Sequence, residues 1–239
     1  MRIPGAPRLR VLDTRRRTRL AAALVLALVA VALVVEIGGD ASGAEGERCA
    51  SFAAASQARR AAPVAKTGQD LVVIGDSWAA GLGLDDPGRS WTSRLDGRVH
   101  VDAFSGSGFS RHASPCSGAW FAARAPRAVA AGADLVLVEG GLNDVDQSDA
   151  ALRAGFARVM RAVQGPPVVV VGPAAAPARE AGARRVDAVL ATLASEAGAA
   201  YVSTVGLDLD YLEDGLHLTL DGHRELGDFV ARSLAELAG

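Results

Sequence analysis

Ser77 stands at the end of an apolar run, in the segment VVIGDSWAAG at residues 72–81. The β-forming residues lead directly into Gly75-Asp76-Ser77, which predicts a buried strand that ends in a tight turn. A serine hydroxyl becomes a nucleophile when a base removes its proton. A place between a strand and a helix exposes the hydroxyl and directs backbone N–H groups toward an oxyanion. The same place also suits a helix N-cap, a role that serine fills well.

Four histidines could supply the base, and His217 is the best placed of them. It lies in the segment EDGLHLTLDGH, three residues after Asp214. At that spacing a carboxylate reaches the imidazole Nδ1, fixes the tautomer and leaves Nε2 free for the serine. The other three are in less suitable places: His223 in a predicted helix, His100 in a strand pattern and His112 in a polar loop.

A serine nucleophile also needs hydrogen-bond donors for the oxyanion that forms on the attacked carbonyl. Gly108, in the segment SGSGFS, could offer a close backbone N–H, and Asn143, in GGLND, could offer its side-chain amide. Gly106 is a rival to Gly108 in the same segment. Taken singly, Gly108 also suits an ordinary turn and Asn143 an Asx turn.

Apolar strands alternate with helical segments along the body of the chain. The hydrophobic patterns predict strands at residues 70–77, 98–104, 133–141, 166–173 and 199–205. They predict helices at roughly 88–96, 119–131, 147–164, 177–197 and 220–238. Apolar strands separated by helices of this length are typical of a parallel sheet covered on both faces. We therefore expect an α/β fold, a three-layer α/β/α sandwich with a five-stranded parallel sheet.

The candidate residues follow the predicted strands. Ser77 comes after the first strand, Gly108 after the second and Asn143 after the third, while Asp214 and His217 follow the fifth. Because the carboxyl ends of parallel strands meet at one edge of a sheet, ligands bind there. The sequence therefore predicts that these five residues lie close together.

In this order, Gly-Asp-Ser, glycine, Gly-x-Asn-Asp and Asp-x-x-His resemble the motifs of the SGNH hydrolases, also called the GDSL esterases and lipases. The resemblance covers about residues 70–235 and implies a flavodoxin-like sandwich. It implies that Ser77 is the nucleophile, that His217 is the base and that Asp214 orients the base. It also implies an oxyanion hole made by the N–H groups of Ser77 and Gly108 and the amide of Asn143.

The resemblance further implies a hydrolase of carboxylic esters that needs no cofactor and no metal. Trp78 stands where the family has its name-giving leucine, and Trp78, Phe109 and Trp120 are candidate walls of a substrate pocket or parts of the core. Since no long insertion forms a lid, we expect an open site for short-acyl or acetyl esters of envelope or extracellular lipids or polysaccharides. The alternatives are a lipase or thioesterase on longer acyl chains and a catalytically silent surface binding module.

Other classes of function fit the sequence less well. Neither GxxxxGK[ST] nor GxGxxG follows the first strand, which argues against the common nucleotide-binding loops. Asp76, Asp144 and Asp214 could converge on a metal ion, but no two histidines have the spacing of metal ligands. From Glu45 onward the chain carries 18 basic and 24 acidic residues, which argues against nucleic-acid binding.

The beginning of the chain predicts export. Residues 1–20 hold seven arginines and one aspartate, and residues 20–35 are apolar without a charge. Such a helix spans about 24 Å, and the arginines orient its N-terminus toward the cytoplasm. We expect the chain to divide into four parts: a basic region at 1–19, a hydrophobic helix at 20–38, a linker at 39–68 and the hydrolase domain at 69–239.

Two outcomes remain open for the hydrophobic helix. It is either a single-pass membrane anchor with the catalytic domain outside the cell or a signal peptide cleaved after Ala44 to give a secreted protein. The anchor is favoured because the basic region is long and the apolar run is uninterrupted.

Cys49 and Cys116 are the two cysteines of the sequence. Export would place them in an oxidising compartment, where such pairs form disulfides. We therefore expect a bridge between them, the alternative being two free thiols. Closing a loop of this length contributes about 4 kcal/mol in the chain-entropy model.

Overall fold

The computed structural model describes residues 43–62 and 67–239. The chain divides into two compact units, Met1–Glu47 and Arg48–Gly239, and the second contains every candidate site residue. The apolar run at 20–35, where the sequence predicts a membrane anchor or signal peptide, lies outside the described residues. Among the helices that the structure describes, none is long and apolar enough to cross a membrane.

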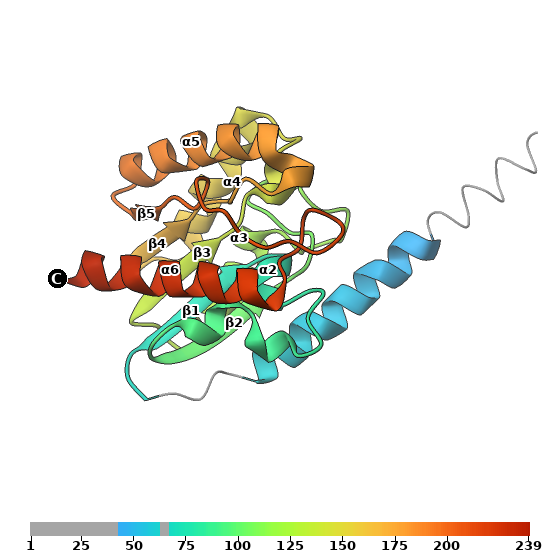
Figure 1. Ribbon diagram of the computed structural model, residues 1–239. Helices are drawn as coiled ribbons and strands as arrows, with labels where there is room; N and C mark the ends of the chain where they lie inside the picture. Colours follow the sequence, from blue (N-terminus) through green and yellow to red (C-terminus); the bar gives the residue numbers. More distant parts are fainter. Residues whose placement is uncertain (1–42, 63–66) are drawn as a thin grey trace, which may run out of the picture. The chain divides into compact units, whose positions relative to one another are not determined.

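The second unit is built on a five-stranded sheet in which every neighbouring pair of strands is parallel (Figure 1). Its order is β2-β1-β3-β4-β5, so β1 pairs with both β2 and β3. The strands are β1 (Asp70–Gly75), β2 (Arg98–Ala103), β3 (Leu135–Glu139), β4 (Val168–Val171) and β5 (Ala200–Val202). The prediction of a parallel sheet with five strands is confirmed.

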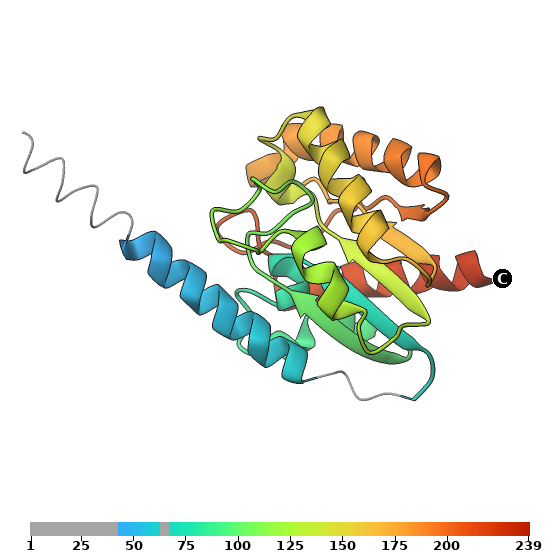
Figure 2. The ribbon, with the colours of Figure 1, turned by 180° about the vertical axis from the view of Figure 1, so that it is seen from behind.

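Helices cover both faces of the sheet because its strands are apolar on both sides. The helices are α2 (Ser77–Ala80), α3 (Phe121–Ala128), α4 (Asp149–Ala162), α5 (Glu180–Glu196) and α6 (Leu220–Ala238). Along β1, Val72 and Ile74 belong to the core shared with α3, α4 and α5, whereas Leu71 and Val73 belong to the core shared with α2 and α6. Figure 1 shows α6 in front of the sheet, and Figure 2 shows α3 and α4 on the opposite face.

The predicted helix at 88–96 is wrong, because two 3₁₀ turns, Pro87–Arg89 and Trp91–Arg94, occupy this segment instead. Ser90 separates them with a ψ of 167°, which no helix accommodates. Its hydroxyl donates to the carbonyl of Ala79 at 3.2 Å. The buried hydrogen bond of Ser90 to helix α2 therefore overrides the local tendency to continue a helix.

The structure also differs from the expected linker, because residues 43–61 form a helix. Alanine, which has the highest helix propensity, is frequent in this segment. Within the second unit, Ser56 and Arg59 are buried while Cys49 and Phe52 are half-buried. Their spacing of three, four and three residues defines one face of a helix. We refer to residues 48–61 as the tethered helix, because a disulfide holds it, as described next.

Candidate active site

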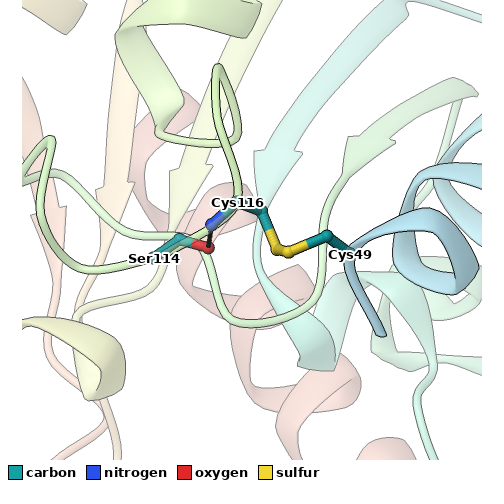
Figure 3. Close-up of a disulfide and its surroundings, with 3 residues drawn as sticks. All are labelled: Cys49, Ser114 and Cys116. Atoms are coloured by element: carbon teal, nitrogen blue, oxygen red, sulfur yellow. Dashed lines mark hydrogen bonds between the residues drawn. A yellow bond between two sulfur atoms is a disulfide. The ribbon is translucent and has the colours of Figure 1, made fainter. Parts of the chain in front are cut away.

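Cys49 of the tethered helix is bridged to Cys116, in the long loop after β2 (Figure 3). Their Cα atoms are 5.5 Å apart, and the N–H of Cys116 donates to the hydroxyl of Ser114 at 3.2 Å. The predicted disulfide is thus present in the structure. It fastens the helix to the same loop that carries Gly108.

Ser77 opens helix α2 at the end of β1, and the residue before it caps that helix. Asp76 Oδ1 accepts the N–H of Trp78 at 3.0 Å, so the aspartate fills the N-cap role. Ser77 is 7% exposed, and within the described part of the chain neither its N–H nor its hydroxyl has a hydrogen-bond partner. The capping role that serine could have filled is already taken, which leaves both groups available for a ligand.

His217 and Asp214 form a close pair in the loop between β5 and α6. His217 Nδ1 lies 2.6 Å from Asp214 Oδ2. Asp214 Oδ1 also accepts the backbone N–H groups of Leu216 and His217, both at 2.9 Å. Burial alone would raise the pKa of Asp214, but these hydrogen bonds outweigh it and lower the pKa to about 2. The carboxylate is therefore ionised at neutral pH and holds the imidazole by Nδ1.

A hydrogen bond joins the segment of Ser77 to the segment of His217. The indole N–H of Trp78 donates to the carbonyl of Leu216 at 3.0 Å, across 138 positions of sequence. A methyl group placed on Gly83 would lie 4.0 Å from Cβ of His217. The two motifs that the sequence placed after the first and fifth strands therefore meet at one edge of the sheet.

Asn143 joins the turn of Ser77 to the loop of Gly108. Its Nδ2 donates to the carbonyl of Ser107 at 2.8 Å and to Asp76 Oδ2 at 3.2 Å. The N–H of Gly108 has no hydrogen-bond partner among the residues described. The structure thus brings together a free N–H on Ser77, a free N–H on Gly108 and a side-chain amide that connects their loops.

Asp144 shapes the loop that carries Gly108. Its carboxylate accepts the N–H of Phe109 at 3.0 Å and that of Ser110 at 2.7 Å. A Cβ on Gly108 would collide with this carboxylate, so only glycine fits there. Gly106 has a φ of +75°, which identifies it as the glycine of the preceding turn. Sequence reasoning missed this role of Asp144, although its place directly after Asn143 was a usable signal.

Three carboxyl groups are buried around this site. Burial raises the pKa of Asp76 to about 6 and that of Asp144 to about 7. Burial and the nearby Asp76 raise the pKa of Glu139 well above its ordinary range. A charged residue at the end of the apolar strand β3 was the sequence signal for Glu139, and it was not interpreted. The low dielectric surroundings indicated by these shifts are typical of functional sites.

The aromatic residues expected around the substrate lie in different surroundings. Phe109 is fully buried, with its ring centroid 4.9 Å from Phe121 and 5.8 Å from Phe156, so it belongs to the core and forms no pocket wall. Trp78 is 3% exposed and holds the two loops together. Trp120 is half-buried, and the guanidinium of Arg158 lies 5.9 Å from its ring centroid.

His223, the second histidine near an acid, is fully buried in α6. Its Nδ1 accepts the N–H of Trp91 at 3.3 Å, and burial lowers its pKa to about 4. It is therefore neutral and part of the packing between α6 and the 3₁₀ turn Trp91–Arg94. His100 lies on β2, with Nε2 at 3.7 Å from Asp70.

A family model matches residues 73–225, which is more than half of the chain. The chain belongs to the GDSL-like lipase/acylhydrolase family. This family is the one that the sequence motifs resemble, and membership makes the chain a serine ester hydrolase. The matched range begins within β1 and ends within α6, so it includes every predicted catalytic and oxyanion-hole residue.

Solved structures share the fold of this GDSL-like hydrolase at low sequence identity. Est24, a carbohydrate acetylesterase from Sinorhizobium meliloti, is 20% identical with a TM-score of 0.58, covering 71% of this chain and 100% of its own. An inhibitor-bound aryl esterase from M. smegmatis is 18% identical with a TM-score of 0.58, and the match covers 71% of this chain and 100% of the esterase.

A family two carbohydrate esterase from Clostridium thermocellum, in complex with cellohexaose, is 15% identical with a TM-score of 0.60, covering 73% of this chain and 66% of its own. No curated protein sequence matches the chain.

Proposed function

We propose that the chain hydrolyses carboxylic esters through a triad of Ser77, His217 and Asp214. His217 Nε2 takes the proton of Ser77 as its Oγ attacks the ester carbonyl, and the same proton then passes to the leaving alcohol. Water repeats the sequence on the acyl-enzyme, which releases the acid and restores the serine. The N–H groups of Ser77 and Gly108 stabilise the oxyanion in both steps, and the amide of Asn143 joins them when it exchanges its hydrogen bond to Asp76 for one to the oxyanion.

The observation that carries this proposal is the pair His217–Asp214 fastened to the turn of Ser77. The 2.6 Å contact at Nδ1 leaves Nε2 for the nucleophile. The bond from Trp78 to Leu216 places the residues next to Ser77 and His217 in contact. The unpartnered N–H groups of Ser77 and Gly108 support the oxyanion hole.

Short-acyl or acetyl esters are the proposed substrates. Two of the similar structures are a carbohydrate acetylesterase and a carbohydrate esterase, which supports an ester of a polysaccharide or a related small molecule as the substrate. We also propose export, which the Cys49–Cys116 bridge supports because disulfides persist in oxidising compartments. Intact mass of the protein recovered from cells distinguishes an uncleaved anchor from a mature secreted form.

The test is hydrolysis of p-nitrophenyl esters from acetyl to palmitoyl by the full chain and by Ser77→Ala. We expect activity that is highest on short chains and is lost in the variant, with an unchanged circular dichroism spectrum. A preference for long chains would assign a lipase instead. A folded protein that hydrolyses none of these esters, or a fully active Ser77→Ala, would refute the triad.

A further inference from the structure

A groove of about 600 Å³ lies between the tethered helix and the loop that follows helix α2. The helix contributes Ala55, Ala58 and Arg59 to its lining, and the loop contributes Leu82, Gly83 and Leu84. Most of this lining is apolar. The groove therefore has the size and the walls of a binding site for an organic ligand.

Two residues in the wall of the groove lie next to Ser77 and His217. Leu82, in its wall, donates its N–H to the carbonyl of Ser77 at 3.0 Å. Gly83, also in the wall, is the residue whose added methyl group would lie 4.0 Å from Cβ of His217. Because His217 would protonate the departing alcohol, the side of the site next to His217 is the side on which the alcohol part of the ester lies.

Arg59 gives the groove a charge. It is 5% exposed, its Nη2 donates to the hydroxyl of Thr92 at 2.8 Å and its Nη1 to the carbonyl of Ala62 at 3.1 Å. Its Nε has no hydrogen-bond partner among the described residues, and no carboxylate there forms an ion pair with it. Burial lowers the pKa of Arg59, and the charge of Asp86, which also lines the groove, partly offsets this effect. Asp86 is exposed, accepts the N–H of Gly88 at 2.9 Å and makes no ion-pair contact with Arg59 within 4.0 Å.

A buried cation that has only an exposed carboxylate nearby and no close ion pair is costly, and a bound anion would offset that cost. We propose that this groove binds the alcohol part of the substrate, and that this part carries a carboxylate recognised by Arg59. The substrate class is thus an acetyl or short-acyl ester of an acidic alcohol with an apolar body. This inference rests on the proposed esterase function.

The probes are 4-acetoxyphenylacetate and its methyl ester, which share the acetyl group and the aryl body and differ in one charge. We expect the native chain to hydrolyse the acid with the higher kcat/KM. The value of kcat/KM for the acid divided by that for the methyl ester is the measured ratio. Arg59→Gln should lower this ratio by about tenfold, the loss typical of one charge-assisted hydrogen bond. Arg59→Lys, which keeps the charge, should recover part of that ratio.

Two control variants distinguish recognition of the substrate's carboxylate by Arg59 from the role of Arg59 in holding the tethered helix. Thr92→Val removes the hydrogen bond to Arg59 but keeps its charge, and Arg60→Gln removes a neighbouring charge that lies outside the groove. Both should keep the native ratio. A native chain that hydrolyses both esters equally, or an Arg59→Gln ratio equal to the native one, would overturn the inference and leave the esterase function intact.

A binding measurement makes the result independent of turnover. The anion 4-hydroxyphenylacetate is titrated calorimetrically into Ser77→Ala and into Ser77→Ala combined with Arg59→Gln. Binding that weakens about tenfold in the double variant supports the groove site even where hydrolysis fails. Absence of binding to both proteins would refute it. Ala58→Phe, which narrows the groove, should also weaken binding, whereas Ala54→Phe on the exposed side of the helix should not.

Discussion

The indole N–H of Trp78 donates to the carbonyl of Leu216, so the neighbour of the proposed nucleophile holds the neighbour of the proposed base. In Trp78→Phe the ring still fills the core, but the carbonyl of Leu216 loses its buried donor. We expect the free energy of unfolding to fall by about 1–2 kcal/mol and kcat to fall more than KM changes. Urea unfolding and steady-state kinetics on p-nitrophenyl acetate measure both. An unchanged kcat would show that this bond does not position the triad.

Asp214→Asn tests the orientation of the base. The amide at this position loses the ionised acceptor for Nδ1, so the imidazolium formed during the reaction is no longer stabilised. We expect kcat to fall by about a hundredfold or more, while the circular dichroism spectrum stays that of the folded chain. Asp221→Asn, which breaks only the surface pair with Arg224, is the matched control. A loss smaller than threefold in Asp214→Asn would contradict the proposed role.

Asp144 is predicted to make stability depend on pH. Its pKa is about 7 in the folded chain, above the ordinary value of an aspartate near 4. Between these two pH values the folded protein binds the proton that the unfolded chain has released, so its contribution to stability falls as pH rises. The difference in free energy of unfolding between the native chain and Asp144→Asn should therefore shrink from pH 4 to pH 7, by at most about 1.4 kcal/mol per pH unit.

Denaturant titrations of both proteins at several pH values check this prediction. A difference that stays constant with pH would mean that Asp144 is ionised throughout. Asp144→Asn should also be less stable at every pH, because its NH₂ group faces one of the two backbone N–H groups that the carboxylate accepts.

His223 is expected to make stability depend on pH in the direction opposite to Asp144. Burial lowers its pKa to about 4, so below pH 6.5 the unfolded chain takes up a proton that the folded chain does not. Its contribution to stability is present above pH 6.5 and is lost as pH falls toward 4. His223→Asn, whose amide oxygen can still accept the N–H of Trp91, should lose less stability than the native chain over this range. Equal losses in both proteins would disprove the assignment.

Removal of the disulfide is expected to destabilise the second unit. Cys49 and Cys116 are 67 positions apart, and opening a loop of that length costs about 4 kcal/mol in the chain-entropy model. Cys49→Ser combined with Cys116→Ser should lower the urea midpoint accordingly. Because the bridge also fixes one wall of the groove, the double variant should lose more kcat/KM on aryl acetates than on ethyl acetate. Equal losses of kcat/KM on the two kinds of ester would show that the disulfide has no role in substrate binding.

The sequence predicted the sheet well because β1, β3 and β4 are apolar on both faces, a pattern that only a covered parallel sheet explains. It predicted the adjacency of Asp214 and His217 because that pair is local. It missed the tethered helix, whose inner face mixes Cys49 and Phe52 with Ser56 and Arg59, so hydrophobic periodicity does not reveal it.

Contacts between distant segments also could not be predicted from the sequence. The sequence left Phe109 open as a pocket wall or a part of the core, and only the packing of its ring against Phe121 and Phe156 places it in the core. The groove near Arg59 depends on two elements that no local pattern relates. Such features arise from tertiary packing, and short motifs carry no information about it.

The hydrogen bond between Trp78 and Leu216 joins points 138 positions apart, so the proposed site combines residues made at different times during synthesis. The turn of Ser77 is made early, but His217 and Asp214, the proposed base and its carboxylate, come from the last loop, just ahead of α6. A nascent or C-terminally truncated chain holds the serine without the histidine. If the proposed triad is correct, a chain that ends before His217 would not hydrolyse esters, and ester turnover would report only molecules in which both ends of the domain have come together.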